Sequence, residues 1–299
     1  MACCDEVRAM VRLSGAELQC WRRQQLACGT AGASALDWLL ELEGGLAWRQ
    51  LQRSHLDPEQ LLELRCSLQH LEQLWQRHHQ QQVPLQHLVG RAPWRDLNLQ
   101  VSPAVLIPRQ ETELLVDLAV DTGCTPQRWA DLGTGSGCLA LALARQWPGS
   151  EGWAVDCSAD ALLVAQANAA ELPQPHGRLH WRRGRWWEPL LPLAGRLQLV
   201  VSNPPYIPSG VVDGLEPLVR EHEPRLALDG GADGLDDLRC IIGAAPAMLS
   251  PGGWLLLEHH HDQSAQVLEL LHLAGLQQCR PAHDLEGKLR FALARAPQP

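Results

Sequence analysis

The alternation of short apolar runs and helical segments after Pro108 limits the folds open to this chain more than any other feature of its sequence. Runs typical of strands cover residues 128–132, 152–156, 197–202 and 254–258, with another near Leu179 and two more at the C-terminus. Helical patterns between them start near residues 111, 159 and 235. Strands that alternate with helices form a mainly parallel sheet covered on both faces. We therefore predict an α/β fold for this part.

The segment from Ser14 to about Gln82 has a helical pattern instead. Ser14 and Glu17 have the spacing of a capping box, which predicts a helix running to about Cys28. Residues 57–59, Asp-Pro-Glu, have the residue types of a helix start, and Leu61, Leu64, Leu68, Leu71 and Trp75 then recur every three or four residues. The pattern predicts a small bundle of about five helices.

Turn-forming residues between positions 90 and 107 predict a hairpin-like connector between these two parts. The sequence thus predicts three parts, with boundaries at 1–83 for the helical domain, 84–108 for the linker and 109–299 for the α/β domain.

The overall composition excludes several classes of protein. A net charge of −9 disfavours a surface that grips nucleic acid throughout. The ten cysteines form no C-x-x-C pair, which disfavours a zinc site or a disulfide framework. No stretch approaches the roughly 20 apolar residues of a membrane span, and no signal peptide is visible. These observations predict a cytoplasmic protein that is not attached to a membrane.

A glycine-rich loop, Gly133-Thr134-Gly135-Ser136-Gly137, follows the first strand of the α/β part and opens a helix. Glycines let the backbone adopt positive φ and approach a ligand closely. A phosphate-binding loop would need Gly-Lys-Ser/Thr, and a dinucleotide fingerprint would place Gly or Ala where Cys138 stands. The G-x-G-x-G spacing is instead similar to that of class I, Rossmann-like methyltransferases.

Asp156 ends the next predicted strand. A carboxylate at that position can accept hydrogen bonds from both hydroxyls of a ribose. Together with the glycine loop, Asp156 predicts a site for S-adenosyl-L-methionine. The alternative is a tight turn that only caps a helix.

The strand at 197–202 runs into Asn203-Pro204-Pro205-Tyr206. Pro204 biases Asn203 toward an extended conformation, and the prolines contribute no backbone N–H. The Asn203 side-chain oxygen and the Pro204 carbonyl therefore offer two acceptors for a planar –NH2 group. The face of Tyr206 can pack on the substrate or near the cationic sulfonium. The alternative is a proline-rich turn with a structural tyrosine.

An amide nitrogen is a poor nucleophile because its lone pair is delocalised into the carbonyl. Hydrogen bonds to both of its N–H groups can orient the lone pair toward an activated methyl group and favour positive charge developing on nitrogen. The tetrapeptide and the glycine loop together predict methyl transfer to a planar –NH2 group.

These motifs resemble the HemK/PrmC family, the glutamine methyltransferases of peptide chain release factors. The resemblance runs in order from Pro84 to the C-terminus, and upstream of Pro84 it holds in size and character more than in sequence. Besides the glycine loop and Asn203–Tyr206, it includes 84–90 (PLQHLVG), 105–109 (VLIPR), 111–113 (ETE), 223–231 (EPRLALDGG) and 233–235 (DGL).

The resemblance implies specific roles. Gly133–Gly137 and Asp156 would hold S-adenosyl-L-methionine, and Trp186 would pack against the adenine. Asn203 would contact both cofactor and substrate, with Pro204–Tyr206 completing the glutamine site. The substrate would be the glutamine of the Gly-Gly-Gln motif, the domain at 1–83 would help dock the release factor, and the domain at 109–299 would carry out the transfer. We expect a monomer without a metal ion.

Several residues depart from the family pattern or have two interpretations. Arg185 stands where the family usually has an Asp that accepts from the adenine amino group, and Arg cannot accept. Either the affinity for the cofactor is lowered or a neighbouring acid replaces that Asp. Arg109, Glu111 and Glu113 fit either a salt-bridged helix start or a wall of the substrate channel. Consecutive histidines at 259–261 point to opposite faces of an extended chain, which disfavours a shared metal ion.

Two other functions are compatible with these motifs. An N6-adenine nucleic-acid methyltransferase also acts on a planar –NH2 group, but it needs a basic platform. Residues 1–90 hold 8 Arg and 10 acidic residues, a net charge of −2, so the extra domain does not supply one. A non-catalytic relative that binds a translation factor is the other alternative, and Arg185 alone points to it.

Overall fold

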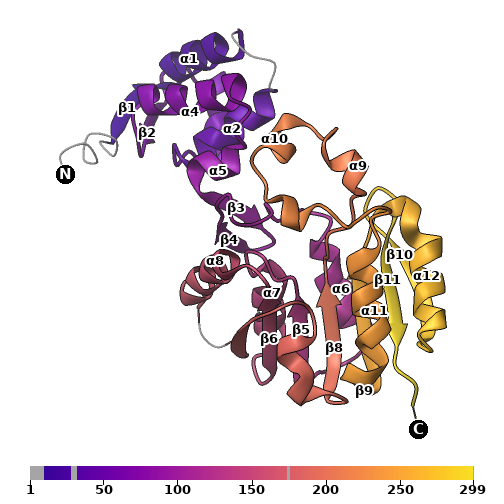
Figure 1. The fold of residues 1–299 in the computed structure, drawn as a ribbon. Coiled ribbons are helices and arrows are strands. Elements are labelled where there is room, and N and C mark those ends of the chain that lie inside the picture. Colours follow the sequence, from indigo (N-terminus) through magenta and orange to yellow (C-terminus); the bar gives the residue numbers. More distant parts are fainter. Residues whose placement is uncertain (1–9, 28–31, 174–175, 299) are drawn as a thin grey trace. The chain divides into compact units, whose positions relative to one another are not determined.

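The computed structural model describes residues 10–27, 32–173 and 176–298. The chain divides into two compact units, Met1–Gly90 and Arg91–Pro299 (Figure 1). Within the described ranges, no helix is long and apolar enough to cross a membrane.

In its described residues, 10–27 and 32–90, the first unit combines five helices with one pair of strands. Its helices are α1 (Gly15–Ala27), α2 (Ala33–Leu42), α3 (Trp48–Leu56), α4 (Leu68–Gln80) and α5 (Leu85–Val89). Strand β1 (Val11–Ser14) pairs antiparallel with β2 (Leu61–Leu64). Fully buried leucines from α1, α2, β2 and α4 surround Trp75, which is 1% exposed, and form the core of this unit.

One helix start of this unit is confirmed and another is wrong. The Ser14 hydroxyl accepts from the Glu17 N–H at 3.2 Å, and the Glu17 carboxylate accepts from the Ser14 N–H at 2.7 Å. The expected end of this helix near Cys28 lies outside the described residues. By contrast, Asp57 ends α3, and α4 begins only after Ser67, whose hydroxyl caps it. The leucines at 61–64 form β2 because they pair with β1, and alternate ones are buried.

The second unit begins with a hairpin of β3 (Arg91–Trp94) and β4 (Leu97–Gln100), in the segment where turn-forming residues predict a hairpin-like connector. A seven-stranded sheet follows, in the order β10-β11-β9-β8-β5-β6-β7. Its strands are β5 (Arg128–Leu132), β6 (Glu151–Asp156), β7 (Arg178–Arg183), β8 (Leu197–Ser202), β9 (Leu249–Glu258), β10 (Gln277–His283) and β11 (Leu289–Arg295). Strands β5 to β9 are parallel, whereas β11 pairs antiparallel with both β9 and β10. The predicted mainly parallel α/β fold is confirmed.

Helices bury both faces of this sheet. Side chains of α11 (Asp236–Met248) and α12 (Ser264–Leu273) pack with Ala130 and Leu132 of β5 in one core. Those of α6 (Glu113–Asp121) and α7 (Cys138–Gln146) pack with Trp129 in the other. Because successive residues of a strand point to opposite faces, β5 contributes to both cores. The remaining helices are α8 (Ala159–Ala170), α9 (Ser209–Val212), α10 (Pro217–Arg220), η2 (Glu188–Leu193), η3 (Arg225–Ala227) and η4 (His261–Gln263).

The register of the central strands brings the predicted motifs to one edge. Leu132, the last residue of β5, lies opposite Val155 of β6 and Ser202 of β8. The residues that follow these three positions are Gly133, Asp156 and Asn203. The segment that carries α9 and α10 leaves the same, carboxyl edge of β8 (Figure 1). In open α/β sheets ligands bind at this edge.

Candidate active site

A cavity of about 400 Å³ lies at the carboxyl edge of the sheet. This volume is within the range of small-molecule sites, roughly 300–1,000 Å³. Eight of the residues predicted for the site line it: Gly133, Thr134, Gly135, Ser136, Asp156, Trp186, Asn203 and Pro205. Gly137, Pro204 and Tyr206 are not among the lining residues. The lining also includes Arg109, Thr112, Arg185 and Asp237.

The glycine loop is held by its backbone conformation and by buried hydrogen bonds. Gly133 and Gly135 have φ of +75° and +56°, values that L side chains rarely adopt. A Cβ on Gly133 would lie 3.2 Å from the Trp186 ring, so glycine lets that ring lie over the loop. The Thr134 hydroxyl donates to Asp131 at 2.6 Å. Burial raises the pKa of Asp131 to about 7.

Gly137 lies in different surroundings from Gly133 and Gly135. Its φ is +84°, and it is the residue that precedes α7. A Cβ there would lie 3.1 Å from the Cβ of Ala165 in α8, so glycine allows the two helices to approach closely. Glycine at 137 therefore permits this close packing, and the cofactor contact that the family resemblance implies for it stays a prediction.

Asp156 projects from the end of β6 and ties the glycine loop to the following turn. Its Oδ2 accepts from the N–H of Gly135 at 2.9 Å, and its Oδ1 accepts from the N–H of Ser158 at 2.9 Å. Desolvation raises its pKa, and these backbone bonds oppose the shift. Each carboxylate oxygen can accept a further bond, so two acceptors remain available at the cavity wall.

Trp186 and Asp237 form a second wall. Trp186 has φ of +48°, a strained value for a bulky residue that is often found at functional sites. Its indole N–H donates to Asp237 Oδ1 at 3.1 Å, and Arg185 Nη2 donates to the same atom at 2.8 Å. The Asp237 side chain is 10% exposed. Sequence reasoning missed Asp237, which lies at the start of a helix 52 residues after Arg185.

Asn203 is anchored by side chains from two other elements. Its Nδ2 donates to Thr112 Oγ1 at 3.0 Å, and Thr112 Oγ1 donates to Glu258 Oε2 at 2.7 Å. Thr112 and Glu258 are 2% and 1% exposed. Burial raises the pKa of Glu258 to about 7. Sequence reasoning missed both partners, although Thr112 lies in the segment 111–113 and Glu258 ends a predicted strand.

The other residues of the Asn-Pro-Pro-Tyr loop differ in their exposure to the cavity. Pro205 lines it, whereas Pro204 is buried and is absent from the lining. The Tyr206 ring packs against the core formed with α11 and α12, and its hydroxyl donates to Glu258 Oε1 at 3.4 Å. Burial raises the pKa of the Tyr206 phenol. In this structure Tyr206 therefore contacts Glu258 and the hydrophobic core rather than the cavity.

Of the charged residues at and just before the start of α6, Arg109 lines the cavity and Glu111 and Glu113 do not. The Nη2 of Arg109 donates to both carboxylate oxygens of Glu223 at 2.7 and 2.9 Å. The Glu223 side chain is 1% exposed, so this ion pair holds the chain segment 223–227 beside the cavity. Glu113 instead accepts from the Arg95 N–H at 2.9 Å, and neither it nor Glu111 is among the lining residues.

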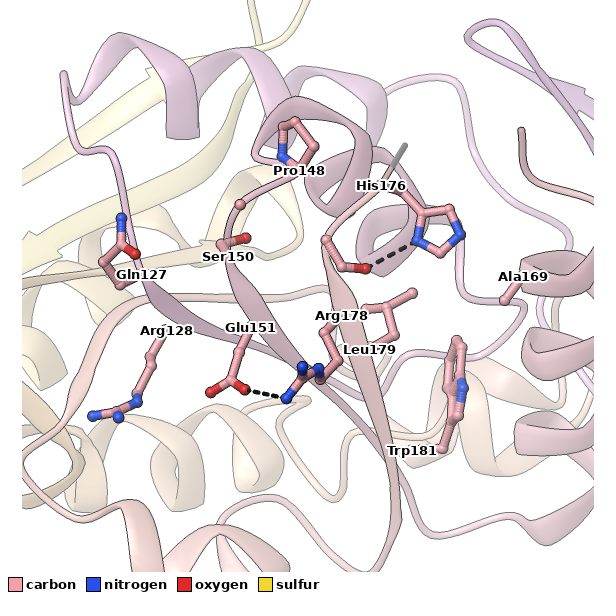
Figure 2. Close-up of a pocket in the computed structure, with 12 residues that line it drawn as sticks. Gln127, Arg128, Pro148, Ser150, Glu151, Ala169, His176, Arg178, Leu179 and Trp181 are labelled. Carbon is pink, nitrogen blue, oxygen red and sulfur yellow. Dashed lines mark hydrogen bonds and ion pairs between the residues drawn. The ribbon is translucent and has the colours of Figure 1, made fainter. Parts of the chain in front are cut away.

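A larger, open hollow of about 940 Å³ lies at the opposite end of the strands (Figure 2). It is lined by residues at the starts of β5, β6 and β7, including Arg128, Glu151 and Arg178. Arg178 donates to Glu151 at 3.1 Å, so these charges neutralise each other. None of the predicted motifs contributes to it, and ligands of parallel sheets bind at the other edge. We therefore assign the site to the smaller cavity.

Within the run of histidines at 259–261, the rings of His260 and His261 contact each other, with centroids 4.2 Å apart. His259 is fully buried, and its Nδ1 lies 2.8 Å from the carbonyl of His260. His260 contacts Asp262 through its own Nδ1 at 2.5 Å. Throughout the described ranges, no group of three or more His, Cys, Asp or Glu side chains is arranged to hold a metal ion.

Comparisons with known proteins agree with this site. The model of the methyltransferase small domain matches residues 110–232. The release factor glutamine methyltransferase of Prochlorococcus marinus is 49% identical over 288 residues, covering 95% of this chain and 98% of the relative. The protein of the same name from Thermosynechococcus vestitus is 43% identical and covers 89% and 92%.

A solved structure shows the same fold. The hMettl16 catalytic domain, in complex with MAT2A 3'UTR hairpin 6, matches with a TM-score of 0.53 at 17% identity, covering 67% of this chain and 75% of that chain. At this identity the likeness concerns the fold alone. The identities of 49% and 43% over most of the chain, by contrast, confirm the resemblance indicated by the motifs, and this chain belongs to the release factor glutamine methyltransferase family.

Proposed function

We propose that this protein transfers a methyl group from S-adenosyl-L-methionine to the side-chain amide nitrogen of the glutamine in the Gly-Gly-Gln motif of peptide chain release factors. The relatives that cover most of the chain carry that activity in their names. The structural observation that supports it most is Asn203: it lines the cavity beside the glycine loop, and its Nδ2 is already bonded to Thr112. Its Oδ1 therefore remains as an acceptor for a substrate amide.

The residues that line the cavity are suited to bind S-adenosyl-L-methionine. A Cβ at position 133 would crowd the Trp186 ring. Glycine at positions 133 and 135, both with positive φ, therefore allows a ligand to approach the loop backbone. We propose that Thr134, Ser136 and Gly137 keep the loop in this shape and that Asp156 accepts from the ribose hydroxyls. S-adenosyl-L-methionine, when bound, supplies an electrophilic methyl carbon on a sulfonium.

Arg185 occupies the position of the family's usual adenine-binding Asp, and we propose that Asp237 takes over the role of that Asp. It lines the cavity beside Trp186, against which the adenine would pack. Its Oδ1 already accepts from Arg185 and Trp186. A carboxylate has further acceptor positions, which could take a hydrogen bond from the adenine amino group.

The chemistry requires orientation more than a strong base. We propose that Asn203 Oδ1 accepts from one N–H group of the glutamine amide and holds its nitrogen toward the methyl carbon. The Pro204 carbonyl, which is not part of the cavity lining in this structure, would accept from the other N–H group when substrate binds. The new N–C bond forms as the C–S bond breaks, and the nitrogen then loses one proton to solvent. The amide proton becomes acidic only as positive charge develops, so no buried base is needed. Tyr206 would support the loop through Glu258.

The remaining parts of the proposal concern partners. We propose that the unit at residues 1–90 helps dock the release factor, that the protein acts as a monomer in the cytoplasm, and that nucleic acid is not its direct substrate. The net charge of −2 over residues 1–90 supports the last point, since a platform for nucleic acid would be basic.

Methyl transfer tests this function directly. Purified protein, labelled S-adenosyl-L-methionine and a release factor should give one methyl group on the Gly-Gly-Gln glutamine, located by mass spectrometry of peptides. Duplex DNA is the parallel substrate, and label on DNA alone would contradict the proposal.

Asn203→Ala separates the roles within the site. It deletes an acceptor for the reacting amide, so kcat should fall by about 100-fold, as for loss of one preorganised group in other active sites. Calorimetry should show a cofactor Kd within about threefold of wild type. Unchanged turnover would remove Asn203 from the mechanism.

A further inference from the structure

Three polar groups, two in the cavity wall and one behind it, are connected in a line. Asn203 follows β8, Thr112 immediately precedes α6, and Glu258 is the last residue of β9. Hydrogen bonds of 3.0 Å and 2.7 Å connect Asn203 to Thr112 and Thr112 to Glu258. Of the three, Asn203 and Thr112 line the cavity, whereas Glu258 lies behind them.

When Glu258 is ionised, the hydrogen-bonding capacity of these groups allows only one arrangement. An ionised carboxylate is an acceptor only, and a hydroxyl has a single hydrogen to donate. Because Thr112 gives that hydrogen to Glu258, it can only accept from Asn203. The Asn203 side chain must therefore turn its –NH2 group toward Thr112. The opposite orientation would place Asn203 Oδ1 against the lone pairs of the Thr112 oxygen.

We infer that Thr112 and Glu258 are positioning residues that fix the orientation of the Asn203 side-chain amide, so that its oxygen faces the substrate. This inference rests on the proposed function. The two orientations of an Asn amide have nearly the same shape and differ in which atom is an acceptor. Only one of them can accept from the –NH2 group of a glutamine. The other would bring two –NH2 groups together.

The protonation of Glu258 affects this arrangement. Burial raises its pKa to about 7, Thr112 and Arg290 oppose the shift, and Glu111 adds to it. Tyr206 and Cys138 are the other titratable groups that interact with it. A protonated Glu258 could donate to Thr112, which would free the Thr112 hydrogen to bond Asn203 Oδ1. Both amide orientations would then be allowed, and the fraction of competent enzyme would fall.

A matched pair of substitutions at Thr112 tests the inference. Thr112→Val keeps the shape and removes the hydroxyl, whereas Thr112→Ser keeps the hydroxyl. We expect Thr112→Val to lower kcat by about 10- to 100-fold and Thr112→Ser to stay within about threefold of wild type. The cofactor Kd should change less than twofold in both. Thr122→Val, at the other end of α6, where the hydroxyl donates to Ala119, is the control.

The outcomes of this comparison are distinct. A Thr112→Val enzyme as active as Thr112→Ser would overturn the inference, and so would equal losses in both variants, because shape rather than the hydroxyl would then matter. If wild type methylates no release factor, the proposed function fails as a whole. If wild type is active and Thr112→Val retains full kcat, the inference alone fails.

Glu258→Gln provides an independent measurement should Thr112→Val fold poorly. Glutamine can accept from Thr112 through its oxygen but does not titrate. The kcat of wild type should fall as the pH is lowered from 8 to 6. The factor by which it falls should be at least three times larger than the factor for Glu258→Gln over the same range. Parallel pH profiles of the two enzymes would contradict a positioning role for the Glu258 carboxylate.

Discussion

Asp156→Asn is the substitution that tests the cofactor site most directly. The carboxylate accepts from the N–H of Gly135 through one oxygen and from the N–H of Ser158 through the other. Asparagine has nearly the same shape but only one acceptor atom. Whichever way it turns, its –NH2 group must face one of these two backbone donors.

The expected loss follows from counting hydrogen bonds. Two ribose hydroxyls would donate to the Asp156 carboxylate, and asparagine can accept at only one of the two positions. Hydrogen bonds to a charged acceptor contribute about 1.5–3 kcal/mol each. Losing one such bond raises the Kd for S-adenosyl-L-methionine by about 10- to 150-fold. The bond lost from Gly135 or Ser158 loosens the loop and acts in the same direction.

Isothermal titration calorimetry with S-adenosyl-L-methionine measures this change. Asp160→Asn, in the first turn of the following helix, is the matched control because Asp160 is exposed and is not among the lining residues. Its Kd should equal that of wild type. Thermal unfolding of both variants shows whether the fold is kept. A folded Asp156→Asn protein with a Kd within twofold of wild type would refute the ribose assignment.

Two further predictions concern acids that sequence reasoning missed. Asp237→Asn should raise the cofactor Kd about fivefold, because one hydrogen bond loses its charged acceptor. Asp236→Asn, at the exposed neighbouring position, should leave the Kd unchanged. Equal Kd values for the two variants, measured by calorimetry, would contradict the adenine contact. Folding raises the pKa of Glu258 from 4.5 to about 7, so the folded state holds its proton longer and loses stability as the pH rises between these values. Glu258→Gln cannot titrate, so its free energy of unfolding relative to wild type should increase by up to about 3 kcal/mol from pH 5 to pH 8. Urea unfolding at both pH values checks this, and an unchanged difference would show that Glu258 does not titrate in that range.

Local features of the sequence predicted most of the second unit. The strands and helices there have distinct periodicities, and β5, β6, β8 and β9 are largely buried on both faces, so their apolar runs stand out. The glycine loop, Asp156 and Asn203 follow strand ends, and the carboxyl ends of parallel strands share one edge. Their meeting at one cavity could therefore be expected before any coordinates.

The first unit shows where such reasoning fails. The leucines at 61–64 fit a helical stripe and an alternating strand equally well, because a run of four residues does not separate the two periods. What decides between them is the pairing of β2 with β1, about 50 residues earlier in the chain. Non-local pairing of this kind leaves no mark in the local pattern.

The strands of the second unit, the glycine loop and the Asn-Pro-Pro-Tyr motif could be predicted without coordinates, because each is recognised in a run of neighbouring residues. Only the tertiary structure showed which distant side chains complete the site. Thr112 and Glu258 are 146 residues apart, and Asp237 lies 51 residues from Trp186. A buried hydrogen bond depends on where two elements dock, and docking is decided by packing across the whole sheet rather than by the residues on either side of each partner.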